Sequence, residues 1–137
     1  VLMASGEDLP GNVKAVIADC GYTSEWDEFQ READALHIPW FPVLNATSVL
    51  SKIRDGYDFK QASALAQVKK SRIPTLFIHG SSDELVPYSM LGELYAAAAC
   101  EKEELTVEGA GHALSSSVAP TLYWRTVEDF IAKYLDR

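Results

Sequence analysis

An acid and a histidine each follow a short apolar run, and together they could carry proton-transfer chemistry. Asp83 comes after the run 73–79 and a Gly-Ser-Ser turn, and His112 lies in a Gly-Ala-Gly-His-Ala sequence at 109–113. An acid that accepts the imidazole Nδ1–H fixes the histidine tautomer and stabilises the imidazolium as it forms. The imidazole can then deprotonate a weak nucleophile and later protonate a leaving group. Asp83 and His112 are therefore candidate members of a catalytic triad.

Each of the two residues also has a plainer explanation. An acid after a strand is commonly a turn former or a helix cap, and a histidine between glycines is commonly a loop residue. In open α/β sheets, however, the reactive edge is the carboxyl end of the strands. Because both residues follow predicted strands, in this order, we favour the catalytic interpretation.

The elements that must position these residues follow from the hydrophobic pattern. Compact apolar runs predict strands that are buried on both faces. Strands alternating with helices imply a parallel sheet with crossover helices, the α/β class. The predicted strands are 13–20, 74–79 and 104–107, and the predicted helices are 24–36, 43–54, 61–70, 88–99 and 118–136, after a helix end at 1–7.

Two segments, 78–87 and 109–112, closely resemble the acid and histidine motifs of the α/β-hydrolase fold. The likeness is closest to bacterial serine hydrolases of the esterase, acylglycerol-lipase and serine-aminopeptidase-like group, and it covers essentially the whole chain. It implies the C-terminal part of such a fold, with 1–20 and 73–137 as hydrolase core and 21–72 as a helical cap insertion. In that family the chain order is nucleophile, acid, histidine.

The sequence departs from this family at the nucleophile. Gly-x-Ser-x-Gly is absent: Ser5 lacks the preceding strand, Ser24 is better explained as a helix cap, and Ser115 to Ser117 start the last helix. The expected nucleophile lies a few residues before Val1, and the oxyanion hole is also expected upstream. We therefore expect a fragment that is inactive alone, lacking the nucleophile elbow.

The predicted cap is rich in aromatic residues, since seven of the 14 in the chain lie between 22 and 59. Packing of the cap on the sheet is one explanation. The other is a pocket for an acyl or aromatic group, because ligand sites are mostly apolar. Trp40 and Phe41, between two prolines, and Tyr22 are the candidate pocket residues.

The remaining reactive side chains have structural interpretations. Cys20 and Cys100 are predicted at opposite ends of the strands, too far apart for a disulfide. Cys20 as a nucleophile is the less favoured alternative to a small buried residue. We expect His79 to make a structural hydrogen bond and His37 to be solvated. The spacing of the sequence indicates no metal site and no cofactor.

Composition limits the partners. The net charge of −8 and the pI near 4.8 argue against nucleic acid and against an anionic membrane surface. There is no membrane segment, because no apolar run reaches the roughly 18 residues needed for one, and no signal peptide is visible. We expect a cytoplasmic protein. A three-stranded sheet would leave an unpaired edge, which predicts a homo-oligomer formed through that edge.

The sequence thus predicts the C-terminal fragment of a serine hydrolase that cleaves a small-molecule acyl ester or amide by a Ser-His-Asp triad. A serine peptidase acting on small peptides is the close alternative. The alternative from another class is a non-catalytic α/β module, in which Asp83 and His112 are turn residues.

Overall fold

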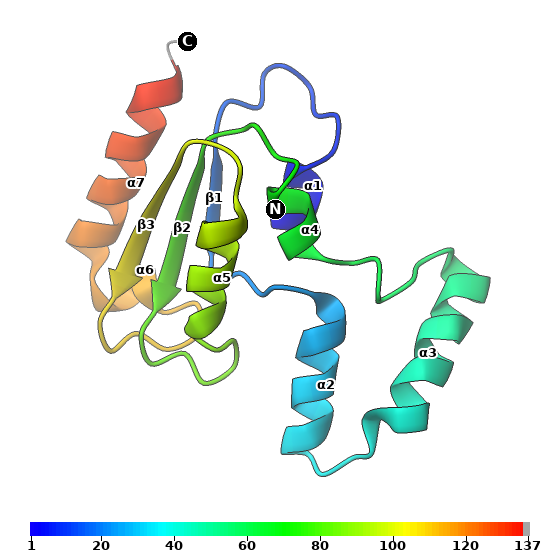
Figure 1. The fold of residues 1–137 in the computed structure, drawn as a ribbon. Helices are drawn as coiled ribbons and strands as arrows, with labels where there is room; N and C mark the ends of the chain where they lie inside the picture. The colour runs from blue at the N-terminus through cyan, green and yellow to red at the C-terminus, as the bar shows by residue number, and fades with distance from the viewer. Residues whose placement is uncertain (136–137) are drawn as a thin grey trace.

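Three parallel strands form the centre of the chain in the computed structural model, which describes residues 1–135 (Figure 1). They are β1 (Val16–Asp19), β2 (Thr75–Gly80) and β3 (Lys102–Val107), in the order β1-β2-β3. The register pairs Val16 with Thr75 in β1 and β2, and Gly80 with Val107 in β2 and β3. All three carboxyl ends therefore lie at one edge, which confirms the predicted α/β class.

Seven helices surround or extend from this sheet in the described part of the chain. They are α1 (Leu2–Ser5), α2 (Glu25–Ala35), α3 (Trp40–Asp55), α4 (Ala64–Val68), α5 (Ser89–Ala97), α6 (Ser115–Val118) and α7 (Pro120–Leu135).

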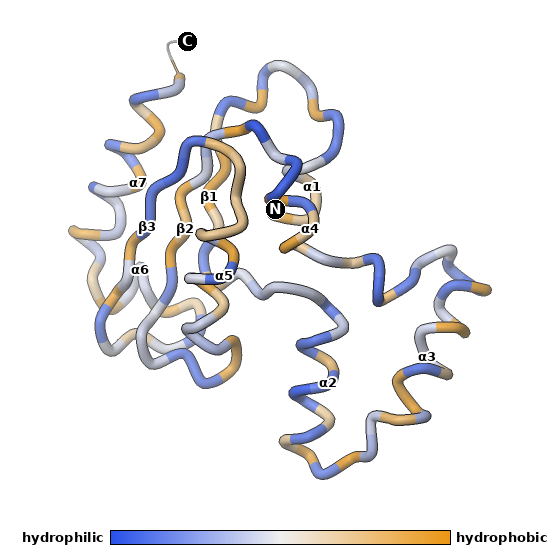
Figure 2. The backbone as a smooth tube through the Cα atoms, viewed as in Figure 1, coloured by the Kyte–Doolittle hydropathy of each residue, from blue (hydrophilic) through white to orange (hydrophobic). Residues whose placement is uncertain are grey.

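The core has two halves, one on each face of the sheet. All six residues of β2 are buried, as expected for the central strand of a sheet that is covered on both sides. On one face Phe77 packs with residues of α1, α4 and α5. On the other face Leu76 and Ile78 pack with Phe130 of α7. The hydropathy colouring shows β2 as largely apolar between these layers (Figure 2).

Helices α2 and α3 stand to one side of the sheet (Figure 1). Ser24 caps α2 by accepting the N–H of Asp27 at 3.1 Å, as a serine at this position commonly does. Helix α4 lies within the range 21–72 that we assigned to the cap, yet it packs against α1 and α5 in the core. The division of the chain into core and cap stays a prediction.

Several boundaries differ from the sequence-based expectation. The first strand is shorter than 13–20, and α3 starts earlier than residue 43, at Trp40, with Phe41 non-helical before a cis bond to Pro42. The last helix is preceded by a separate turn, α6, because Pro120 has no N–H with which to continue a helix.

The two cysteines are free, as predicted. No helix within residues 1–135 combines the length and the apolar character needed to cross a bilayer.

Candidate active site

Asp83 and His112 meet at the carboxyl edge of the sheet. Asp83 follows β2, His112 follows β3, and the His112 Nδ1 atom lies 2.9 Å from Asp83 Oδ2. Gly80 makes this approach possible: a Cβ atom there would lie 2.2 Å from the carbonyl oxygen of Ala110. The Ser82 N–H also donates to that carbonyl at 3.0 Å. The end of β2 and the histidine loop are therefore held against each other by their backbones.

The Asp83 carboxylate is buried and supplied with donors. Its Oδ1 atom accepts the N–H groups of Leu85 and Val86 at 3.0 and 2.9 Å, while Oδ2 accepts from His112. Burial by itself would raise the pKa of Asp83, but the hydrogen bonds from Val86 and His112 outweigh it and bring the pKa below its ordinary value. Asp83 is therefore ionised at neutral pH and can orient the imidazole.

The other side of the His112 ring is open to a pocket. The His112 side chain is 36% exposed, and no residue in the range 1–135 hydrogen-bonds its Nε2 atom. The pocket has a volume of about 260 Å³. Its lining residues are Cys20, Tyr22, Glu28, Glu32, Leu85, Val86 and His112.

Cys20 ties the histidine loop to β1. It is buried, has a φ of 55°, and its Sγ atom accepts the N–H of Ala113 at 3.3 Å while donating to Asp19 Oδ1 at 3.2 Å. Burial, with a smaller contribution from Asp19, raises the pKa of Cys20 to about 12. A neutral thiol is a poor nucleophile, which favours the structural interpretation of this residue.

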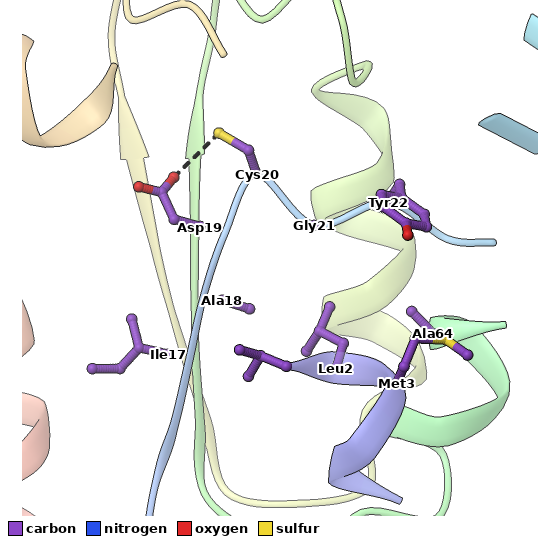
Figure 3. A pocket seen from close by; sticks show the side chains of 10 residues that line it. Leu2, Met3, Ile17, Ala18, Asp19, Cys20, Gly21, Tyr22 and Ala64 are labelled. Carbon is purple, nitrogen blue, oxygen red and sulfur yellow. Dashed lines mark hydrogen bonds between the residues drawn. The ribbon is translucent and has the colours of Figure 1, made fainter. Parts of the chain in front are cut away.

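A second pocket, of about 220 Å³, flanks the open edge of β1 (Figure 3). It is bounded by Leu2 and Met3 of α1 and by the end of β1 at Asp19 and Cys20. Tyr22 lines both this pocket and the one beside His112. Of the three predicted pocket residues, Tyr22 is thus the one beside the acid–histidine pair.

Trp40 and Phe41 lie elsewhere, on α3. Trp40 lines an apolar pocket of about 290 Å³ between α2 and α3, with Phe29, Leu44 and Phe59 among its neighbours. Phe41 is 67% exposed and its ring centroid lies 6.3 Å from that of Trp40. The structure therefore brings Trp40 into a pocket of the α2–α3 pair, and leaves Phe41 mostly in solvent.

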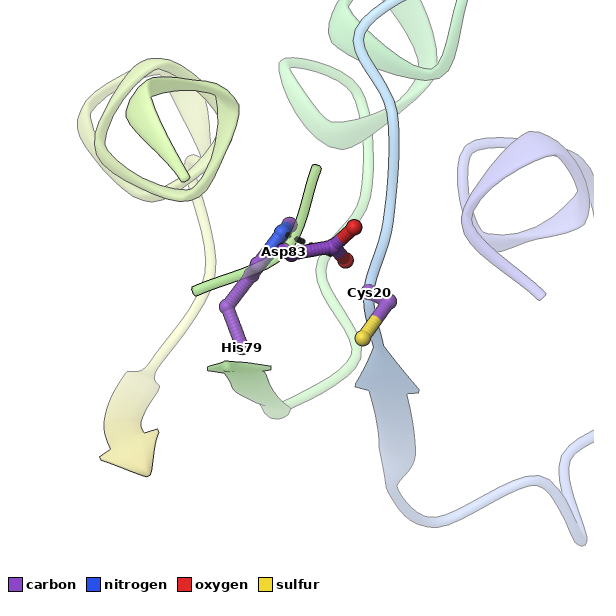
Figure 4. A group of neighbouring side chains, drawn as sticks. All are labelled: Cys20, His79 and Asp83. Atoms are coloured by element: carbon purple, nitrogen blue, oxygen red, sulfur yellow. Dashed lines mark ion pairs between the residues drawn. The ribbon is translucent and has the colours of Figure 1, made fainter. Parts of the chain in front are cut away.

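Cys20, His79 and Asp83 place a sulfur, a nitrogen and an oxygen atom within 4.8 Å of one another (Figure 4). Their atom types would suit a divalent transition metal. However, His79 Nε2 already contacts the carbonyl of Val86 at 3.0 Å, and Cys20 is a neutral thiol, whereas a metal ligand is the thiolate. We therefore interpret this cluster as support for Asp83.

No serine in the described part of the chain hydrogen-bonds His112. The hydroxyl of Ser5 donates to the carbonyl of Leu2, that of Ser24 bonds Asp27, and that of Ser115 points to Asp19. Ser5 and Ser115 are also buried. The contact of Ser24 agrees with its expected role as a helix cap, whereas Ser115 starts the short helix α6 and not the last helix as expected.

The acidic face of α2 was not foreseen from the sequence. Glu28 and Glu32 line the pocket beside His112, and Arg31 between them pairs with both carboxylates and with the carbonyl of Leu85. Burial is the main cause of a raised pKa at Glu28. The charge of Arg31 opposes this shift, and the charges of Glu32 and Asp83 add to it. The helical spacing of Glu25, Glu28 and Glu32 was a signal that they share one face.

Comparison with known sequences gives distant relatives. An uncharacterized protein of Bacillus subtilis, YqkD, is 28% identical over 131 residues, which make up 95% of this chain and 43% of that protein. An uncharacterized protein of Mycobacterium tuberculosis, Rv2307c, is 32% identical over 81 residues, 59% of this chain and 25% of that protein. No family model matches the sequence. The chain thus spans less than half the length of the curated relatives it matches.

Solved structures identify the fold. An esterase from Pyrococcus furiosus superposes with a TM-score of 0.69 at 16% identity, over 98% of this chain and 49% of that one. An esterase domain from Rhodothermus marinus gives 0.65 at 18%, over 98% and 55%. A hydrolase from Pseudomonas aeruginosa gives 0.61 at 18%, over 94% and 59%. The chain therefore has part of the α/β-hydrolase fold.

Proposed function

We propose that this chain supplies the acid and the histidine of a serine hydrolase that cleaves carboxylic esters, with the serine contributed by a longer polypeptide. One observation carries the proposal: the 2.9 Å contact between His112 Nδ1 and a buried Asp83 carboxylate, beside a pocket that the other side of the ring faces. The fold shared with two esterases supports the same class of reaction.

In the proposed reaction His112 Nε2 takes the proton of the serine hydroxyl as the serine oxygen bonds to the carbonyl carbon of the substrate. The resulting imidazolium then protonates the leaving alkoxide as the carbon–oxygen bond breaks. Water adds to the acyl-enzyme by the same sequence, which restores the serine. Asp83 remains ionised throughout and keeps the Nδ1–H directed at itself. Tyr22 would bound the substrate beside His112, and Trp40 and Phe41 would contact a longer acyl group from the α2–α3 pair.

A fluorophosphonate probe, which reacts with activated serines, tests the proposal. The longer polypeptide should be labelled, and His112→Asn should lower the labelling rate by at least about a hundredfold, the usual contribution of a general base. The 137-residue chain alone should remain unlabelled.

His37→Asn is the matched control, because His37 is exposed and asparagine tolerates its φ of 56°. It should be labelled like the unmodified protein. Labelling of the 137-residue chain would show that it holds its own nucleophile. An unlabelled, folded longer polypeptide would favour the non-catalytic α/β module.

A small-peptide serine peptidase is the second candidate, and the acidic face of α2 favours it. Glu28 and Glu32 line the same pocket as His112. Two carboxylates there would attract the free ammonium group of a peptide N-terminus and would disfavour anionic acyl groups. The same triad chemistry applies to an amide, with the amine as the leaving group.

A further inference from the structure

We propose that His79 is a positioning residue for Asp83, the candidate triad acid: its Nε2–H holds the turn that carries the carboxylate. His79 lies in β2 with its side chain fully buried. Its Nε2 atom is 3.0 Å from the carbonyl oxygen of Val86 and 3.3 Å from Asp83 Oδ2 (Figure 4). This role rests on the proposed function, but the contacts that define it can be tested without activity.

The surroundings of the ring determine its tautomer. Both neighbours of Nε2 are acceptors, a carbonyl and a carboxylate, so this nitrogen must carry the hydrogen. The Nδ1 atom is buried and has no partner among residues 1–135. A charged imidazolium would add a buried N–H without an acceptor, which is costly. The geometry therefore favours the Nε2–H tautomer, which donates to the carbonyl of Val86 at 3.0 Å while Asp83 Oδ2 lies 3.3 Å from the same nitrogen.

The Nε2–H group of His79 is part of a small hydrogen-bond network around Asp83. Val86 donates its N–H to Asp83 Oδ1 and accepts from His79 through its carbonyl. Asp83 Oδ2 faces both imidazoles, His79 at 3.3 Å and His112 at 2.9 Å. The turn 83–86 is thus bound to the central strand through His79, and the direction of Oδ2 toward His112 depends on that bond.

Other groups around His112 do not replace this bond. Glu28 and Glu32 approach from α2, and the thiol of Cys20 approaches from the end of β1. As carboxylates, Glu28 and Glu32 offer no donor to the turn 83–86, and the Cys20 thiol directs its hydrogen to Asp19 Oδ1 at 3.2 Å. His79 is the link between Asp83 and the interior of β2.

Two variants separate hydrogen bonding from space filling. His79→Gln keeps an N–H donor near the position of Nε2, and His79→Met has a similar volume without one. The readout is solvent exchange of the His112 Nδ1–H proton by NMR on the 137-residue chain. We expect exchange to rise by about tenfold or more in His79→Met, as the order of a lost hydrogen bond, and to return toward the original rate in His79→Gln.

Leu76→Val is the matched control, since Leu76 is buried in the same strand but lies on the opposite face from His79, in the cluster with Phe130 of α7. It should leave the exchange of the His112 proton unchanged. Equal exchange in all variants, or an equal rise in His79→Met and His79→Gln, would overturn the proposal, because the ring would then only fill space.

A measurement on the unmodified chain covers the case in which His79→Met does not fold. Long-range proton–nitrogen NMR spectra report ring tautomers, and His37→Asn assigns the exposed histidine. We expect His79 to be the neutral Nε2–H form at pH 7. The Nδ1–H form or the imidazolium would contradict the network.

In an active longer polypeptide, His79→Met should lower kcat on the order of tenfold with KM unchanged, since the loss is of orientation.

Discussion

At the scale of single residues, the carboxyl edge of the sheet combines groups of opposite protonation behaviour. Asp83 is buried but held ionised by hydrogen bonds from backbone and imidazole, whereas Cys20, a neighbour of the same carboxylate, is held neutral. The difference follows from what each atom meets: Asp83 Oδ1 accepts two N–H groups, whereas Cys20 Sγ is removed from water by burial and also faces the Asp19 carboxylate. Environment, more than residue type, decides the charge here.

The first residue-scale prediction concerns the Cys20 thiol. With a pKa of about 12, about one molecule in ten thousand carries the thiolate at pH 8. Iodoacetamide should therefore alkylate Cys100 and spare Cys20 in the native chain, as read by mass spectrometry of peptides. Both should react in guanidinium chloride. In Cys100→Ser, native labelling should disappear.

The same shift has a consequence for stability. Because the pKa of Cys20 is raised in the fold above the ordinary 9.0, folding favours the protonated form. This contribution is complete below pH 9 and is lost as pH rises toward 12. Native alkylation of Cys20 as fast as that of Cys100 at pH 8 would show that the thiol is exposed or activated instead.

At the scale of elements, α2 determines which charges line the pocket beside His112. Ser24 caps its start, and the turn spacing then directs Glu28 and Glu32 to the pocket of His112. Arg31 neutralises part of this charge by pairing with both. Helix α2 therefore gives the pocket beside His112 a net negative side.

For the proposed hydrolase, the acidic side of α2 predicts a charge preference. Amino-acid esters with a free ammonium group should be cleaved with a higher kcat/KM than their N-acetylated forms. Glu28→Gln should reduce that ratio by up to about fivefold, the worth of a partly exposed ion pair. Glu93→Gln, on the exposed side of α5, should leave it unchanged. An unmodified protein that prefers the N-acetylated esters would argue against a peptidase and for the esterase proposal.

The elements also show how far the sequence could lead. Local patterns were sufficient for β2, for α2 with its serine cap, and for the positions of Asp83 and His112 past two strand ends, because these depend on apolar runs and on residues near in sequence. The cis bond before Pro42 and the break at Pro120 involve backbone choices that periodicity does not encode. The bond from Ala113 to Cys20 spans 93 residues and arises from tertiary packing alone.

At the scale of the whole molecule, the sheet is covered on both faces, and within residues 1–135 its outer strands β1 and β3 each pair with another strand on one side only. The N–H groups of Val16 and Cys20 point to β2. Since backbone groups alternate along a parallel strand, those of Ile17 and Asp19 point to the open side, where Leu2 and Tyr22 bound a pocket (Figure 3). An apolar strand with free backbone groups is a template for pairing with another chain.

We therefore predict that the 137-residue chain self-associates through β1 at micromolar concentration. Ala15→Pro should weaken the association by about tenfold or more: it removes an N–H that the alternation of the strand directs to the open side, and proline is tolerated at such edges. Sedimentation equilibrium measures the change. Lys69→Gln, at an exposed position after α4, is the control. A monomeric chain, or equal association in Ala15→Pro, would mean that β1 is not the contact.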